Sequence, residues 1–244
     1  MACSVVGAAY VLAVGPFQRA SAAPVHGPIS YDEAASLATD LGASQGGGPW
    51  TVWAGAAVQI QHPYDLSLVS LYDWPPFSCS SDPSTYAGVH SSMMLPASPE
   101  TSPTGYFSVW FVQLGNASGW VRTVLVLNGT PTIALQEGPT HGCTPGAWLP
   151  SADQLGLVLD SPRVLTSAWN GGGSQFVSQN PNANLSIESS FLGSDTTWYW
   201  VVVWSTCPFF IGGHVASGMG ELQTVDVNAL NGTADRETTQ TVAC

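Results

Sequence analysis

The chain presents the same order of segments twice. Each passage opens on a helix-capping pattern, continues through an apolar run into strands rich in aromatic and β-branched residues, and ends on an Asn-Gly-Thr turn and a cysteine. The matching segments are Ser30 to Glu33 with Ser151 to Gln154, Asn128 to Thr130 with Asn231 to Thr233, and Cys143 with Cys244. A recurring order of elements is the signature of a duplicated unit. We therefore predict an α+β fold of two repeats, each a helix followed by an antiparallel sheet of three to four strands.

This prediction divides the chain into a targeting segment (1–23), a first repeat (24–145) and a second repeat (146–244). The first repeat carries a long loop rich in Pro and Ser over 62–105. The second carries a shorter loop over 205–220. Because the two loops are inserted at different places, we expect any function specific to this chain to lie in them.

The N-terminal segment is typical of an export signal. An apolar run from Val5 to Gly15 is followed by Pro16 and by the small residues Ala20-Ser21-Ala22, although no Lys or Arg precedes the run. The run is too short to cross a bilayer, which takes about 20 residues. We expect an extracellular or cell-surface protein that meets a membrane only through this segment, if the segment stays uncleaved.

Charge excludes two classes of partner. The 244 residues include four basic and 16 acidic side chains, so the net charge is −12. A nucleic acid would find no basic surface on such a chain, and anionic membranes are disfavoured for the same reason. The hydrophobic content of 45% is high enough to form a packed core.

Cysteine usage agrees with export. Cys3 falls inside the targeting segment, which leaves four cysteines at Cys79, Cys143, Cys207 and Cys244. An even number in an exported chain predicts two disulfides with three alternative pairings. Cys79–Cys143 and Cys207–Cys244 is the pairing expected if each repeat closes its own loop. No Cys-x-x-Cys occurs, so we expect no zinc or redox motif.

Four asparagines stand in Asn-x-Ser/Thr sequences that are acceptors for N-linked glycans, at Asn116, Asn128, Asn184 and Asn231. Such a set favours a glycosylated, exported surface. Asn128 and Asn231 each precede a glycine, and Asn-Gly is also a common turn sequence. For these two residues, glycan attachment and turn formation remain alternative interpretations.

Local patterns predict most of the secondary structure. Ser30 and Glu33 form a capping box before an apolar helical stripe that ends at Gly42. Strands are expected over 50–61, over the hairpin 107–114 and 120–127, and over 185–192, 198–204 and 221–230. In the second repeat, Ser151 is expected to cap a helix that Pro162 breaks or kinks.

The run Trp198 to Trp204 is apolar on both of its faces. Trp198, Trp200 and Trp204 share one face by period-two spacing, and Tyr199 lies on the other. Core packing is the simplest interpretation. The alternative is an aromatic surface that binds glycans or another subunit, which makes these four residues our candidates for an interaction site.

Two motifs resemble PepSY domains. The helix opening Ser30-x-x-Glu33-Ala34-x-x-x-Ala38 is similar to theirs, and Val225-x-Val227-Asn228-Ala229-x-Asn231-Gly232 resembles their closing strand and turn, with Asn228 where the family usually has Asp. The resemblance implies a small, exported α+β unit that is often duplicated and often associated with peptidases. It brings no catalytic residues with it.

Catalytic motifs are weak. The five histidines are scattered without ligand spacing, Gly-x-Ser-x-Gly does not occur, and Asp195-Thr196-Thr197 lacks the glycine of an acid protease motif. We therefore expect no enzyme activity, cofactor or metal, but a secreted or cell-surface interaction or structural protein that binds a protein partner or itself. One version is a PepSY-like, peptidase-associated binding module. The alternatives are a self-assembling subunit of a filament or surface layer, and an acid-active extracellular hydrolase.

Overall fold

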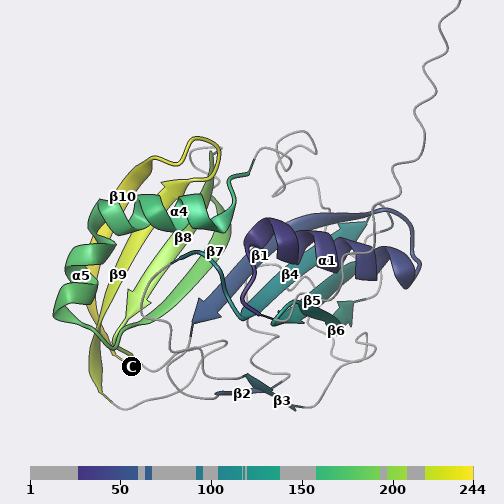
Figure 1. Cartoon of the computed structure of the whole chain (residues 1–244), viewed down its shortest axis with the longest axis horizontal. Helices are drawn as coiled ribbons and strands as arrows, with labels where there is room; N and C mark the ends of the chain where they lie inside the picture. The colour runs from purple at the N-terminus through teal and green to yellow at the C-terminus, as the bar shows by residue number, and fades with distance from the viewer. Residues whose placement is uncertain are drawn as a thin grey trace, which may run out of the picture.

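The protein is built around one antiparallel sheet of eight strands with helices packed on one of its faces (Figure 1). The computed structural model describes residues 27–59, 64–67, 92–95, 104–116, 118, 120–137, 158–192, 197–207 and 218–243. The strand order across the sheet is β10-β9-β8-β7-β1-β4-β5-β6. Strands β2 (Tyr64–Ser67) and β3 (Ser92–Leu95) pair separately as a two-stranded sheet.

The sheet consists of two groups of four strands. Within each group the strands follow one another along the chain, except that β2 and β3 come between β1 and β4. One group is β1 (Trp50–Gln59), β4 (Val109–Asn116), β5 (Val121–Leu127) and β6 (Thr130–Glu137). The other is β7 (Asn184–Leu192), β8 (Thr197–Ser205), β9 (Met219–Asn228) and β10 (Ala234–Ala243). The first group follows helix α1 (Tyr31–Ser44), and the second follows α4 (Ser161–Ala168) and α5 (Ser174–Gln179).

The predicted fold class is wrong. The protein is mainly β, and one eight-stranded sheet contains the strands of both expected units, so it is not an α+β protein of two repeats that each have their own sheet. The two groups join because Ala56–Gln59 of β1 pair with Leu185–Glu188 of β7. The edge strands β6 and β10 also extend the sheet beyond the strands that the sequence predicted. The backbone pairing of β1 with β7 turns the expected boundary between units into the middle of the sheet.

Helix α1 begins as predicted. The Ser30 hydroxyl accepts a bond from the Glu33 backbone N–H at 3.5 Å, and the Glu33 carboxylate accepts one from the Ser30 N–H at 2.9 Å. These are the two reciprocal bonds of a capping box. Ala34 and Ala38 are buried against the sheet, which gives the apolar stripe that the sequence predicted.

Arg122 satisfies the other end of α1. Its guanidinium donates from Nη1 to the carbonyl oxygens of Gly42 at 3.0 Å and Gly46 at 3.3 Å, and it lies 4.2 Å from the centre of the Trp50 ring. A cation at the C-terminal carbonyls of a helix compensates the helix dipole. Since the last turn of α1 contains no basic residue, strand β5 supplies the charge instead.

Helix α4 starts at Ser161, with Asp160 as its N-cap and Pro162 in its first turn. Proline is tolerated there because a backbone N–H in the first turn has no intrahelical partner. The helix predicted to start at Ser151 lies outside the described residues. Gly171 and Gly172 have non-helical backbone angles and form a kink between α4 and α5.

Asp160 and Ser161 also cap α1. The Asp160 carboxylate accepts the backbone N–H of Ser161 at 2.8 Å and that of Asp32 at 3.0 Å, so it serves the first turns of both helices. The Ser161 hydroxyl accepts the Tyr31 N–H at 2.9 Å and donates to the Gly105 carbonyl at 2.6 Å. The N-termini of α1 and α4 therefore share their hydrogen-bonding partners.

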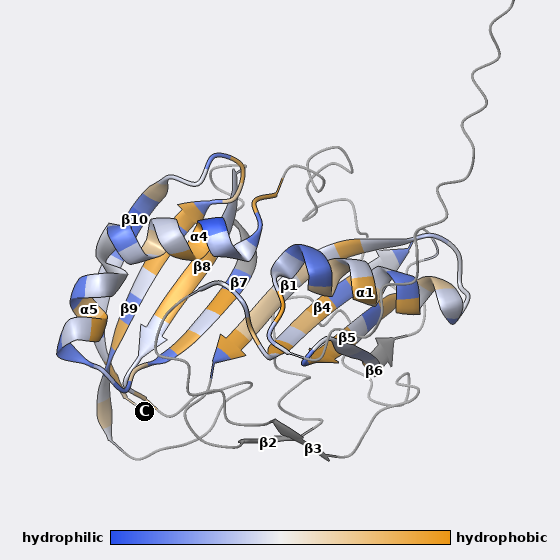
Figure 2. Ribbon diagram, viewed as in Figure 1, coloured by the Kyte–Doolittle hydropathy of each residue, from blue (hydrophilic) through white to orange (hydrophobic). Residues whose placement is uncertain are grey.

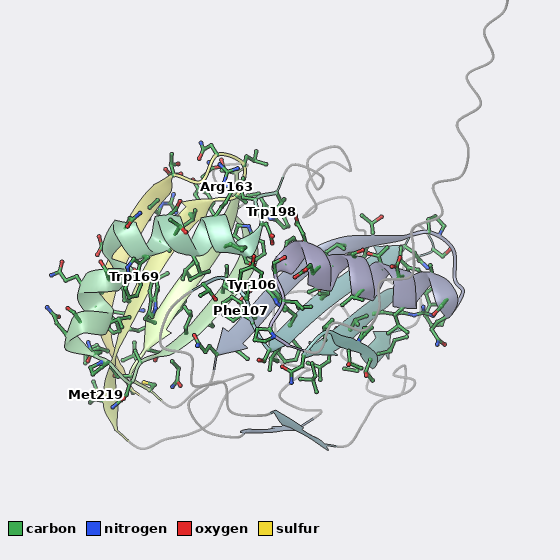
Figure 3. The ribbon with its side chains drawn as sticks, viewed as in Figure 1. Tyr106, Phe107, Arg163, Trp169, Trp198 and Met219 are labelled. Atoms are coloured by element: carbon green, nitrogen blue, oxygen red, sulfur yellow. The ribbon has the colours of Figure 1, made fainter. Side chains whose placement is uncertain are left out.

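Under this junction lies the aromatic centre of the core. The Tyr31 ring packs against Trp110 of β4 and Trp200 of β8, with centroids 5.7 Å and 4.8 Å away. The indole nitrogens of the two tryptophans donate to the carbonyl oxygens that precede the helix caps, Trp110 to Ile29 and Trp200 to Leu159. Figure 3 shows the segment with Tyr106 and Phe107 passing between the two helices, where Phe107 bridges to Ile29.

The central strands are buried on both faces. Every residue of β4 is buried, and Figure 2 shows strong hydrophobic colour along strands such as β8, beneath helices in which hydrophilic and hydrophobic residues alternate. On the helix face lie Trp110, Val112 and Leu114, whereas Phe111 and Gln113 lie on the opposite face. This two-sided burial explains the continuous apolar runs in the sequence.

The shared cap gives a first prediction. Asp160→Ala removes a capping bond from two helices, and each lost N-cap costs about 1 kcal/mol. We expect the free energy of unfolding to fall by about 2 kcal/mol or more in chemical denaturation, and Asp160→Asn, which keeps an acceptor oxygen, to lose much less. If Asp160→Ala lowers the free energy of unfolding only by the ~1 kcal/mol of a single N-cap, Asp160 does not stabilise both helices.

Candidate functional site

The outer edge of β10 is the candidate interaction site. β10 is the outermost strand of the sheet, and it pairs with β9 over its whole length, with Ala234 opposite Val227 and Ala243 opposite Met219. All of its residues are exposed except Val242, which is half-buried. In an edge strand, alternate N–H and C=O groups point away from the sheet and offer a template for another strand.

The opposite edge of the sheet is different. β6 carries Pro131, which has no N–H to offer, and Ala134 of this strand is buried. Proline and burial are two ways in which proteins protect an edge strand from pairing. β10 contains no proline, so the two edges of the sheet are not equivalent.

Side chains on both faces hold β10 to the rest of the sheet. On the helix face, the Glu237 carboxylate accepts a bond from Gln223 Nε2 at 2.8 Å, and the Thr239 hydroxyl donates to Gln223 Oε1. Glu237 also lies against the kink after α4, where a Cβ at Gly172 would come within 2.1 Å of Glu237 Oε1. Gly172 has a φ of +128°, so glycine is required there for backbone and packing reasons alike.

On the face away from the helices, Arg236 holds the strand. It stands opposite Asp226 of β9 in the strand register, and its guanidinium lies 5.9 Å from the centre of the Tyr199 ring. Burial raises the pKa of the Asp226 carboxyl group, against the opposing effect of Arg236 and with a further rise from Asp235. The side chains of β10 are thus directed at their own sheet, above and below it, while its backbone forms the rim.

Charge is distributed unevenly along β10. Asp235, Arg236 and Glu237 stand near its start, and the residues from Thr238 to Ala243 carry no charge. Edge strands that avoid pairing commonly carry charges, above all Lys, along their length. The second part of β10 has no such protection.

The four aromatic residues predicted to form an interaction site are inside the protein. Trp198, Tyr199, Trp200 and Trp204 are exposed by 4%, 6%, 0% and 2%. Trp204 packs against Gly173 of the kink, and its ring centre lies 6.4 Å from that of Trp169. These four residues therefore pack in the core, which was the simpler interpretation, and they are not on the surface.

The four predicted glycan acceptors fall into two pairs. Asn116 is 6% exposed, and its Nδ2 donates to the Gly47 carbonyl at 2.7 Å. Asn184 is half-buried, with its Nδ2 donating to the Cys207 carbonyl at 2.8 Å. Asn128 and Asn231 are exposed in the turns β5–β6 and β9–β10. Asn128 (φ +46°) and Gly129 (φ +79°) form the two-residue turn that joins β5 to β6. The Asn128 side chain is exposed in that turn, so turn formation and glycan attachment are compatible at this residue.

The cysteines are described in part. Cys207 follows β8, is buried, and takes part in a disulfide, as the sequence predicted for this cysteine. Cys79, Cys143 and Cys244 lie outside the described residues, so the predicted pairings remain predictions. Asp195 and the five histidines also lie outside the described residues.

Sequence reasoning missed a half-buried acid on the face without helices. Glu188 lies in the middle of β7, between Ala56 of β1 and Val201 of β8. Burial raises its pKa from 4.5 to about 7. A Glu in the centre of an otherwise apolar and Ser-rich strand was the available signal. An acid-protease mechanism needs two adjacent carboxylates, and the strands on either side of Glu188 place Ala56 and Val201 there instead.

Comparison with known proteins adds no relative: no family model, no curated protein and no solved structure matches the chain. The described residues contain no group of three His, Cys, Asp or Glu side chains placed to hold a metal ion. Among the described helices, none is long and apolar enough to cross a membrane.

Glu188 makes stability depend on pH. Because its folded pKa of about 7 lies above the usual 4.5, folding favours the protonated form. Its contribution is fully present below pH 4.5 and is lost as the pH rises toward 7, by an amount on the order of 3 kcal/mol. Glu188→Gln should therefore flatten the dependence of the unfolding free energy on pH between about 4.5 and 7 and raise stability at pH 8. Parallel pH profiles of variant and parent would contradict this.

Proposed function

We propose that this protein is an exported structural protein that associates with copies of itself by pairing β10 of one chain with β10 of another. The observation that carries the proposal is the exposure of β10 along an unprotected edge of the sheet. The disulfide at Cys207 supports export, since disulfides persist in oxidising compartments.

A second copy suits this edge because of the charge distribution along β10. In an antiparallel pair related by a two-fold axis at Thr239, Thr239 faces its own copy and Glu237 faces Thr241. Arg236 then faces Val242, and Asp235 faces Ala243. The charged end of each strand meets the uncharged end of the other, so no like charges are opposed.

Other registers are less favourable. An axis at Glu237 would place two carboxylates opposite each other, and an axis at Arg236 would oppose two guanidinium groups, which destabilises a strand pair. The axis at Thr239 instead gives a Thr–Thr pair at the centre, one of the cross-strand pairs that stabilise antiparallel sheets. The sheet then continues through both copies, with the described helices α1, α4 and α5 of each copy on the same side.

The first test asks whether the edge is used. Consecutive residues of β10 direct their N–H groups alternately to β9 and to the rim, so one of the variants Gln240→Pro and Thr241→Pro loses a bond to β9 and the other loses an outward donor. We expect one variant to be less stable in thermal unfolding. The other should fold normally but stay monomeric in sedimentation velocity at concentrations where the parent self-associates.

Salt provides a control on the same measurement. Each copy carries a net charge of −12, and salt screens the repulsion between copies. Association of the parent should therefore strengthen as ionic strength rises from about 0.05 M to about 0.5 M. A parent chain that remains monomeric at high concentration under both conditions would overturn the proposal.

The second test asks for the register. In the pair centred on Thr239, Thr241 of each copy faces Glu237 of the other. Thr241→Lys creates two reciprocal ion pairs and should tighten association by about 3- to 10-fold, whereas Thr241→Glu should weaken it by a similar factor. Both variants are compared in a Glu221→Gln background, because Glu221 is the neighbour of Thr241 on β9. Equal effects of Lys and Glu would contradict this register.

A further inference from the structure

The structure distinguishes the four glycan acceptor sequences by what their side-chain amides do. An N-linked glycan is attached to Nδ2 of asparagine and is bulky and solvated, so this atom must be open to solvent and not packed against another segment of the fold. The exposure and the bonding of each Asn in the folded protein therefore decide whether it can carry a glycan there.

Asn116 fails this requirement because it is only 6% exposed and its Nδ2 is held within the fold. Nδ2 donates to the Gly47 carbonyl at 2.7 Å, in the loop after α1. Oδ1 accepts the backbone N–H groups of Ser118 at 2.9 Å and Trp120 at 3.0 Å, which shapes the turn between β4 and β5. Since Nδ2 lies against this loop and the residue is buried, a glycan on Nδ2 would displace the loop after α1.

Asn184 fails for a related reason. Its Nδ2 donates to the carbonyl of Cys207 at 2.8 Å, which ties the start of β7 to the residue in the disulfide. The side chain is half-buried. A glycan there would separate β7 from the segment that follows β8.

Asn128 and Asn231 meet the requirement. Asn128 is exposed at the first position of the β5–β6 turn, with Gly129 and then the exposed Thr130 after it. Asn231 is exposed in the β9–β10 turn, where its Oδ1 accepts the backbone N–H and the hydroxyl of Thr233, both at 2.8 Å. In Asn231 the bonded atom is the oxygen, which a glycan leaves in place.

We propose that Asn128 and Asn231 are N-glycosylated in the exported protein and that Asn116 and Asn184 are not. The inference rests on the export component of the proposed function. The co-reactant is an oligosaccharyl diphosphate: Nδ2 forms a bond to the anomeric carbon of the sugar and loses one proton. The bond from that carbon to the diphosphate oxygen breaks, and the diphosphate leaves with the electron pair.

The position of Asn231 is compatible with pairing of β10. The strand pair centred on Thr239 uses Asp235 to Ala243, and Asn231 precedes this segment in the β9–β10 turn. A glycan at Asn231 therefore lies beyond the paired residues. It would obstruct a register in which the partner strand is shifted toward the start of β10.

The experiment is to express the full chain in a host whose secretory pathway transfers N-glycans and to map glycopeptides of the protein recovered from the medium. Occupancy is expected at Asn128 and Asn231 only. Thr130→Ala and Thr233→Ala should each remove the mass of one glycan, and the double variant should carry none. Ser118→Ala and Ser186→Ala, which destroy the other two acceptor sequences, should leave the glycan mass unchanged.

The outcomes separate this inference from export. A glycan at Asn116 or Asn184 in folded, secreted protein overturns the inference, as does secreted protein without glycans at Asn128 and Asn231. Secretion without any glycan overturns glycosylation and leaves export intact. Retention of unmodified protein inside the cells overturns both.

Discussion

Two helices begin at the same carboxylate, and the rest of the structure depends on that arrangement. Asp160 accepts the first backbone N–H of α4 and one from the first turn of α1. The two helix dipoles therefore present their positive ends to one negative charge. This fixes the distance between the helices, and with it the position of the Tyr31 ring between Trp110 and Trp200.

The same junction explains why the strands form a single sheet. Each tryptophan at the centre of the core donates its indole N–H to the residue just before a helix cap, so helices and strands are fastened to each other at one place. β1 and β7 lie beneath that place and pair over Ala56–Gln59 and Leu185–Glu188. A sheet extended in this way has two edges, and the burial of Ala134 together with Pro131 protects β6 while β10 stays exposed.

The sequence was sufficient for the features that depend on neighbouring residues. The capping box of Ser30 and Glu33, the hairpin of β4 and β5 and the turn at Asn128 follow from local chemistry, and the structure contains all three. β10 was missed because an exposed edge strand buries no apolar face and so has no hydrophobic alternation to recognise. The pairing of β1 with β7 joins segments more than 100 residues apart, for which a single sequence carries no local signal.

The candidate site was predictable to a smaller extent. The aromatic run from Trp198 to Trp204 was correctly placed on a strand. Whether these side chains are exposed depends on which other segments pack on them, and that is decided by the complete fold. Residues distant in sequence also bury Asn116 and half-bury Asn184. They likewise account for the second role of Asp160 and for the raised pKa of Glu188. Each of them required the three-dimensional arrangement.

The central claim is that the two groups of strands form one cooperative unit joined at β1 and β7. Hydrogen–deuterium exchange of the full chain tests it most directly, because amides that open only by global unfolding share one free energy of exchange. The account predicts that the hydrogen-bonded amides of Ala56–Gln59 in β1 and of Leu185–Glu188 in β7 exchange with the same free energy, equal to that of global unfolding. Exchange of one group of strands at a distinctly lower free energy, while the other stays protected, would contradict it.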